Sequence, residues 1–266
     1  MKQVASLRYG VIFKKAFCDI EIFKAFVKDF LDIDLEIDKV ETEKSFTPLI
    51  GNVDSRFDLY AEDKKNRVIV DIQHRYYNDH YDQFLHHHCA AMLEQISNAK
   101  SYTPELQVFT IVVLTSNNAH KSAFSTIYFD PIDYVTGKGL GEIAHKIVYL
   151  SPKHISEKIP APYQEWLMAI EDSLDEKVDE HIYHKPEILK VLKLIEKEGL
   201  TPQDRAQIKD EYALESALQK EKEAEYQKGR HEEKLEIARN MQAQGLSLEL
   251  IAHVTGLDIE TLPYLK

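Results

Sequence analysis

The segment Leu106–Leu114 (LQVFTIVVL) constrains the fold more than any other part of the chain, because it is apolar along both of its faces. A strand of this kind is typical of the centre of a sheet that is covered on both sides. The segments Ser122–Phe129 and Lys146–Leu150 predict two further strands. We therefore expect an α/β fold, in which a small mixed sheet is flanked by helices.

Helical periodicity dominates the two ends of the chain. Apolar residues recur at steps of three and four through Phe13–Leu31, which predicts one amphipathic helix or two short ones. A further helix is expected over Tyr81–Ala99. After Pro160 the pattern is helical almost throughout, and residues 203–243 have the composition of a long exposed helix. These patterns predict an α/β core over residues 1–158 and an all-helical extension over residues 159–266.

Two acidic residues occupy matching positions on a predicted β-hairpin. The strand-like runs Ser55–Ala61 and Arg67–His74 are joined by the polar residues 62–66. A turn centred between the two lysines of that linker places Asp58 directly across from Asp71. Like charges that face each other across a strand pair are destabilising unless a cation lies between them. A hard divalent ion such as Mg²⁺, which prefers oxygen ligands, suits this position.

The hairpin carries a motif that resembles the core of a known nuclease superfamily. SRFD (55–58), followed after the turn by VDIQ (70–73), is similar to the motif of PD-(D/E)xK nucleases, and most similar to the recombination-promoting nuclease / putative transposase (Rpn) family. The opening helix FKKAF (13–17) and the tail 235–257 resemble the same family, so the resemblance covers most of the chain. It implies a restriction-endonuclease-like fold.

The resemblance also implies a site and an activity. Asp58 and Asp71 would bind Mg²⁺, or Mn²⁺ in its place, with help from the backbone carbonyl of Ile72. Gln73 would orient the attacking water or contact the phosphate, and Arg56 would contact a phosphate oxygen or pair with an acid. The implied activity is that of a DNA endonuclease of low sequence specificity, linked to recombination, transposition or phage defence.

The chain departs from the family pattern at two positions. Gly10 stands where the opening helix usually carries an aspartate, and Gln83 stands where the later helix often carries an arginine. The acid that many members supply from the first helix is matched by either Asp19 or Glu21. An alternative prediction is therefore a catalytically weakened protein that binds DNA or a protein partner.

Histidines and cysteines give weaker signals. His86, His87 and His88 are consecutive on a predicted helix and point about 100° apart, so they cannot chelate one ion together. With His74 and His80 nearby, a transition-metal site is an alternative to packing and surface roles, and one or two of these rings could contact a phosphate. Cys18 and Cys89 form no CxxC pair, and we expect both to be buried apolar fillers.

The C-terminal fragment LELIAHVTGLDIETL (248–262) resembles a helix-turn-helix unit. Its expected second helix, Asp258–Leu265, is acidic and offers no Arg, Asn or Gln for contacts with base edges. An oligomerisation or docking role is therefore favoured over sequence-specific DNA binding. A further alternative is that residues 203–266 form an interaction module for which the core is only a scaffold.

The distribution of charge bears on DNA as a partner. The net charge is −12, but residues 1–154 carry 18 basic against 21 acidic side chains, and residues 155–266 carry 15 against 24. The core is therefore close to neutral, which leaves DNA binding open. No run approaches the roughly 18 apolar residues of a membrane helix. We expect a cytoplasmic homo-oligomer that binds DNA and no membrane.

Overall fold

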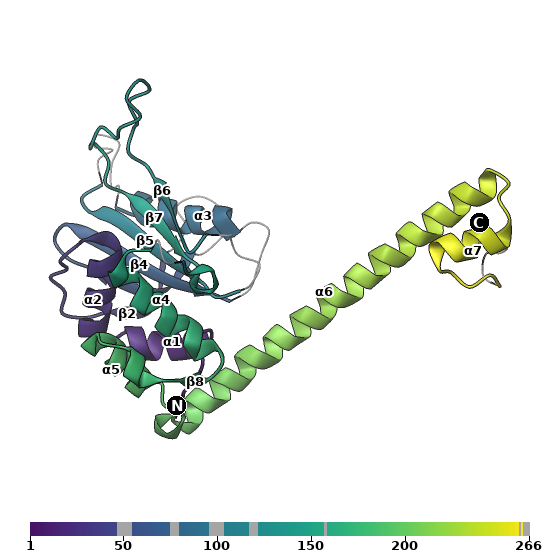
Figure 1. The fold of residues 1–266 in the computed structure, drawn as a ribbon. Coiled ribbons are helices and arrows are strands. Elements are labelled where there is room, and N and C mark those ends of the chain that lie inside the picture. Colours follow the sequence, from purple (N-terminus) through teal and green to yellow (C-terminus); the bar gives the residue numbers. More distant parts are fainter. Residues whose placement is uncertain are drawn as a thin grey trace. The chain divides into compact units, whose positions relative to one another are not determined.

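The computed structural model describes residues 1–46, 55–74, 80–95, 104–116, 122–156, 159–260 and 262 (Figure 1). The chain forms two compact units, Met1–Ile208 and Lys209–Lys266. The first unit holds the sheet and the helices that pack on it. The second unit holds the greater part of the long helix and the C-terminal helix.

A six-stranded mixed sheet is the centre of the first unit, in the order β2-β3-β4-β5-β7-β6. The strands are β2 (Glu41–Phe46), β3 (Ser55–Glu62), β4 (Asn66–Gln73), β5 (Gln107–Leu114), β6 (Phe124–Tyr128) and β7 (Lys146–Leu150). β4, β5 and β7 run parallel, whereas β2, β3 and β6 pair antiparallel with their neighbours. The predicted α/β class is confirmed, and the doubly apolar strand β5 lies inside the sheet as expected.

Helices cover both faces of the sheet (Figure 1). The helices of the first face are α1 (Gly10–Phe17), α2 (Ile20–Leu31), α4 (Ala161–Leu174) and α5 (Pro186–Leu194), and α3 (His80–Leu93) covers the second. Alternation along β4 serves both faces, because Val68 and Val70 join the main core while Ile69 packs with Ala91 of α3. Each fully buried large apolar side chain contributes about 1.5–3 kcal/mol, so the face with four helices supplies most of the stability.

The opening amphipathic segment forms two helices rather than one. Asp19 has an extended backbone and accepts hydrogen bonds from the N–H groups of Glu21 and Ile22, so it is the N-cap of α2. α1 ends just before it, at Phe17. The cap therefore decides between the two helical patterns that the sequence allowed.

The boundary between the units differs from the predicted one. The sequence placed α4 and α5 in the extension that begins at residue 159, but both helices pack against α1 and α2 in the main core. Trp166 of α4 is buried and donates a hydrogen bond to Asp29 of α2 at 2.6 Å. The first unit therefore extends to Ile208. A short sheet of β1 (Lys2–Gln3) and β8 (Lys177–Val178) and the 3₁₀ turns Pro152–His154, Glu180–Ile182 and Lys197–Gly199 complete it.

The helix α6 (Pro202–Ala243) begins in the first unit and continues into the second, passing through Gly229 without a break. In the second unit, Ser247 caps α7 (Leu248–Thr255), and Gly256 ends it in the left-handed region with φ 65°. A small core forms around Ala238, Ile251 and Leu262.

The second helix expected over Asp258–Leu265 is not seen in the part that the structure describes. Asp258 is irregular, Ile259–Glu260 forms a turn and Leu262 has 3₁₀ geometry, whereas residues 261 and 263–266 lie outside the described residues. Across the described segments, no helix combines the length and the apolar character needed to cross a bilayer.

Candidate active site

The predicted hairpin and its register are present. β3 and β4 pair Leu59 with Val70 and continue in that register to the turn. At Asp58, one residue before Leu59, the backbone hydrogen bonds between β3 and β4 end, and hydrogen bonds to side chains take their place. The N–H of Asp58 donates to Oδ1 of Asp71 at 2.8 Å, and the N–H of Ile72 donates to Oδ2 of Asp58 at 3.0 Å. The structure therefore brings the two predicted acids together at the open end of the hairpin.

The two carboxylates lie in a poorly solvated position. Burial raises the pKa of Asp58 to about 7, and the negative charge of Asp71 acts in the same direction. Asp71 is only 4% exposed, and its Oδ2 has no hydrogen-bond partner among the described residues. Among the described side chains, the nearest ring nitrogen is Nδ1 of His87, which is 3.9 Å away. An unpaired buried carboxylate oxygen beside a second carboxylate is a position that favours a cation.

A third acid lies on the neighbouring strand. In β2, Thr42 pairs with Leu59 and Lys44 with Phe57, so Glu43 lies across from Asp58. The backbone of Glu43 has φ 57°, which is uncommon for a residue with a side chain and marks a local distortion of β2. Carboxylates from three adjacent strands therefore occupy one level of the sheet.

Lys14 of α1 provides positive charge at this level. Its ammonium group forms an ion pair with Glu43 and lies 3.7 Å from Oδ1 of Asp58. Burial opposes ionisation of Glu43, but the hydrogen bond and charge of Lys14, with the charge of Arg56, hold the pKa of this carboxyl below its usual value. The site therefore contains an ionised Glu43, a lysine, and an aspartate pair that remains short of positive charge.

The other predicted site residues take different positions. Gln73 is the last residue of β4, two positions after Asp71, and its carbonyl accepts a hydrogen bond from the N–H of Thr115 at 3.0 Å. Arg56 is largely exposed and forms an ion pair with Glu43, as the salt-bridge interpretation predicted. That pairing leaves one edge of the guanidinium in solvent, where it can meet a phosphate.

The two acids considered as additional ligands are engaged elsewhere. Asp19 and Glu21 pair with the ammonium group of Lys190 of α5, at 2.8 and 2.6 Å. Within the described segments, no three His, Cys, Asp or Glu side chains are grouped so that they could hold a metal ion. Neither acid therefore joins Asp58 and Asp71. Gly10 is the first residue of α1, and Gln83 is exposed on α3.

The three consecutive histidines diverge, as their helical spacing predicts. His86 is exposed, whereas His88 is fully buried with its Nδ1 2.9 Å from Oγ1 of Thr110. Burial lowers the pKa of His88 to about 3, so this ring is neutral. Only His87 approaches Asp71, and its Nδ1 is buried without a hydrogen-bond partner among the described residues.

The remaining histidines and the cysteines do not form a common site. Nδ1 of His74 lies 2.8 Å from Oγ1 of Thr115, and the side chain of His80 lies outside the described residues. Cys89 is half-buried, but Cys18 is exposed at the end of α1, so the prediction that it is a buried filler is wrong.

Sequence reasoning missed the site contributions of Glu43 and Lys14, and it named His87 only as one of several candidate rings. The segment Glu41–Phe46 is polar on both faces and gives no alternation from which a strand and its register could be derived. Lys14 was part of a recognised motif, but its spacing along the helix says nothing about which acid it meets. Only the packing of α1 on the sheet reveals that contact.

Comparison with known protein families gives a match at the C-terminal end of the chain. Residues 231–262 match the model described as Rpn/YhgA-like nuclease family, C-terminal HTH domain. The matched segment contains the end of α6, all of α7 and the residues that follow it, so it agrees with the predicted terminal helix-turn-helix unit. It supports a relation to the Rpn family at a coarse level. No curated protein and no solved structure was found to match the chain.

Proposed function

We propose that the protein is a metal-dependent DNA endonuclease that hydrolyses phosphodiester bonds with low sequence specificity. The observation that carries this proposal is the aspartate pair, in which Oδ2 of Asp71 is buried without a hydrogen-bond partner among the described residues, beside Asp58. The match of residues 231–262 to a domain of a nuclease family supports the same activity. The proposed setting is recombination, transposition or phage defence.

The residues present fit a hard divalent cation. Asp58 and Asp71 offer carboxylate oxygens and Ile72 offers a backbone carbonyl, which are the donors that Mg²⁺ and Mn²⁺ prefer. Mg²⁺ usually keeps several waters and needs only one or two carboxylates from the protein. When bound, such an ion would lower the pKa of a water and offset negative charge in the transition state.

Lys14 and Gln73 have different roles in the proposed mechanism. An amide carries no exchangeable charge, so Gln73 can position a water or a phosphate but cannot neutralise either. Lys14 places an ammonium group 3.7 Å from Asp58, where it can stabilise developing negative charge. Arg56, which is exposed at the edge of the same level, would bind a phosphate of the DNA backbone.

We infer that the C-terminal unit binds the DNA substrate. Its helix-turn-helix match supports DNA binding. The net charge of −12 limits long-range attraction to a polyanion, so we expect weak binding that falls further as salt rises. We also propose that the C-terminal helices form a homo-oligomer, because α6 exposes the apolar side chains of Leu214, Tyr226 and Ile237.

A specific observation favours a second function, that of a DNA-binding protein with a weakened nuclease site. Lys14 already neutralises part of the acidic cluster, and the described residues contain no set of three metal-binding side chains. Gly10 and Gln83 add to this alternative. It predicts DNA binding without metal-dependent cleavage.

Nicking of supercoiled plasmid distinguishes the two functions. The purified chain is incubated with plasmid in Mg²⁺, in Mn²⁺ and in EDTA, with Asp71→Asn as the test variant. Asp34→Asn is the matched control, because Asp34 is an exposed aspartate that pairs only with Lys28 among the described residues. Cleavage that requires the metal, survives in the control and is lost in Asp71→Asn supports the endonuclease. If the chain binds the plasmid but does not nick it in either metal, the result supports the second function, that of a DNA-binding protein.

A further inference from the structure

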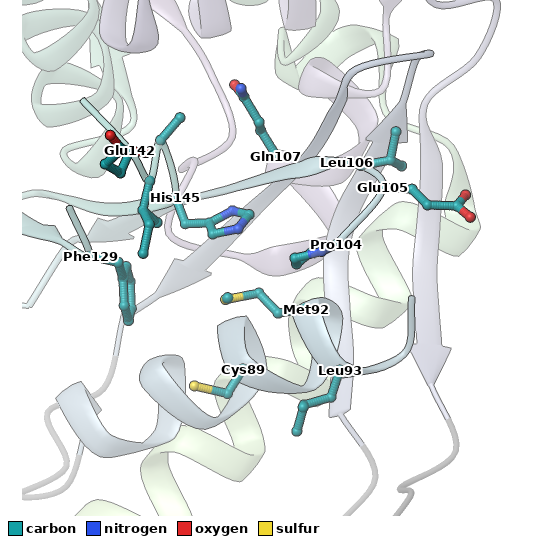
Figure 2. A pocket seen from close by; sticks show the side chains of 12 residues that line it. Cys89, Met92, Leu93, Pro104, Glu105, Leu106, Gln107, Phe129, Glu142 and His145 are labelled. Carbon is teal, nitrogen blue, oxygen red and sulfur yellow. The ribbon is translucent and has the colours of Figure 1, made fainter. Parts of the chain in front are cut away.

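A cavity of about 700 Å³ lies at the other end of the sheet from the aspartate pair (Figure 2). It is bounded by the last turns of α3, the start of β5 and the residues that precede β7. β5 runs parallel to β4 and pairs Gln107 with Asn66 at this end and Val112 with Asp71 towards the other. The cavity is therefore separate from the candidate active site, and its volume suits a small organic molecule.

One polar ring is fixed in the wall of this cavity. His145 is buried, and its Nδ1 accepts a hydrogen bond from the N–H of Val108 at 2.8 Å. A peptide N–H can only donate, so in the neutral ring the proton is on Nε2. Burial lowers the pKa of His145, which keeps the ring neutral at pH 7. Figure 2 shows the imidazole above the side chain of Met92, and both residues line the cavity. The cavity therefore contains a fixed, uncharged N–H donor.

The rest of the wall is mainly apolar and partly flat. Its larger apolar side chains include Met92, Leu93, Leu106, Phe129 and Ile143. The ring of Phe129 stacks on the buried ring of His88, with an interplanar angle of 6° and a centroid distance of 4.9 Å. This stacking fixes the orientation of the Phe129 ring. A flat aromatic surface of this kind is complementary to a planar ligand.

Charge at the cavity selects against anions. Its charged lining residues in the described part of the chain are Glu105 and Glu142, and that part contributes no Lys or Arg side chain to the lining. A phosphate or carboxylate would lose its hydration without gaining a counter-charge. The described lining therefore favours an uncharged ligand over a nucleic acid or a nucleotide.

We propose that this cavity is a binding site for a planar, uncharged heteroaromatic molecule whose ring acceptor receives the Nε2–H hydrogen bond of His145. The rings of the ligand lie against Phe129 and the side chains of α3. The proposal is independent of the nuclease activity, because the cavity shares no lining residue with the aspartate pair.

Methionine methyl groups provide a local readout in the full chain. The sequence has four methionines, of which only Met92 lines the cavity; the others are Met1, Met168 and Met241. Protein labelled with [methyl-¹³C]methionine is titrated with isoquinoline, a two-ring molecule with one ring-nitrogen acceptor. We expect the Met92 signal to shift with a dissociation constant on the order of 1 mM, typical of a ligand of about ten heavy atoms.

Matched variants test the location. Leu93→Trp adds bulk to the cavity wall at a side chain that is already half-exposed, and Leu189→Trp makes the same change on the surface of α5. We expect Leu93→Trp to weaken binding by about tenfold or more and Leu189→Trp to leave it unchanged. Absence of a Met92 shift at 10 mM isoquinoline, equal shifts of all four methionines, or equal binding by both variants would overturn the proposal.

Matched ligands test the chemistry. Indole is nearly the same size but presents a donor N–H in place of the acceptor, and 2-naphthoate keeps two rings but adds a negative charge. We expect both to bind at least about fivefold more weakly than isoquinoline, because one opposes the donor of His145 and the other carries a charge that is not compensated. Tighter or equal binding of either would contradict the assigned ligand class.

Discussion

The ammonium group of Lys14 lies 3.7 Å from Oδ1 of Asp58 and forms an ion pair with Glu43, so a helix on one face of the sheet supplies positive charge to acids on two adjacent strands. The same arrangement leaves Oδ2 of Asp71 without a hydrogen-bond partner among the described residues. The ammonium group of Lys14 therefore compensates Glu43 and part of the charge of Asp58. The buried oxygen of Asp71 that has no partner lies where we propose that a divalent ion binds. The predictions below separate these two contributions.

Replacement of Lys14 by methionine should lower the rate of plasmid cleavage by about 10²- to 10³-fold, the usual cost of removing one group that stabilises transition-state charge. Lys14→Arg should restore part of the rate. Lys28→Met is the control, because Lys28 pairs on the surface with Asp32 and Asp34. Single-turnover cleavage assays measure the three rates, and a wild-type rate in Lys14→Met would remove this residue from the proposed mechanism.

Binding of Mn²⁺ should depend on pH through Asp58. Burial raises the pKa of this carboxyl to about 7, and the metal requires the ionised form. The affinity should therefore fall by about tenfold for each pH unit below 7 and level off above it. Calorimetric titrations at several pH values measure this slope. An affinity that is constant between pH 5 and 8 would show that Asp58 is not a ligand.

The stability of the metal-free protein should respond to pH in the opposite sense. A carboxyl with a folded-state pKa above its unfolded value stabilises the fold at low pH, and this contribution is lost as pH rises through the folded pKa. Asp58→Asn keeps an acceptor for the N–H of Ile72 but cannot ionise. The variant should nearly match the wild type at pH 4 and exceed it by about 4 kcal/mol at pH 8.

Urea unfolding of both proteins in EDTA at each pH tests this relation. Equal stabilities of wild type and Asp58→Asn at pH 8 would mean that the charge of Asp58 is already compensated by Lys14. The same experiment includes Asp34→Asn as the control for replacing an exposed aspartate by asparagine.

The parts of the site that could be predicted from the sequence are those formed by residues close together in the chain. The hairpin and its register follow from local alternation and from turn length, so the Asp58–Asp71 pairing is present in the sequence pattern. Glu43 and Lys14 reach the site through the pairing of β2 with β3 and the docking of α1, which depend on tertiary contacts. No local period encodes those contacts.

The unit boundary shows the same limit. The helical period of α4 and α5 was correctly predicted, but a period does not tell which surface an apolar face will cover. The burial of Trp166 and its hydrogen bond to Asp29 show that α4 belongs to the first unit. Both features connect segments 137 residues apart in the chain.

A chain that ends after Ile208 should therefore fold, whereas a chain that ends at residue 158 should not. The shorter chain lacks α4 and α5 and exposes the apolar faces of α1 and α2 that they cover. Circular dichroism and thermal unfolding compare the two with the full protein. In the longer chain, fluorescence of the single tryptophan, Trp166, should report the same cooperative transition as in the full chain. A cooperative transition in the shorter chain would restore the predicted boundary.

DNA retention by the second unit should require the small core around Ile251. This side chain is fully buried with Ala238 and Leu262, so Ile251→Glu places an unpaired charge in an apolar site and should unfold α7. Leu250→Glu adds the same charge on the same helix at a side chain that is 44% exposed, and it should leave the fold intact. Fluorescence anisotropy with labelled duplex DNA at low salt compares the two. If only Ile251→Glu loses DNA binding, the folded helix-turn-helix binds the DNA. If both variants lose binding equally, the added charge is the cause. If both bind DNA as the unmodified chain does, the DNA contact lies in the first unit.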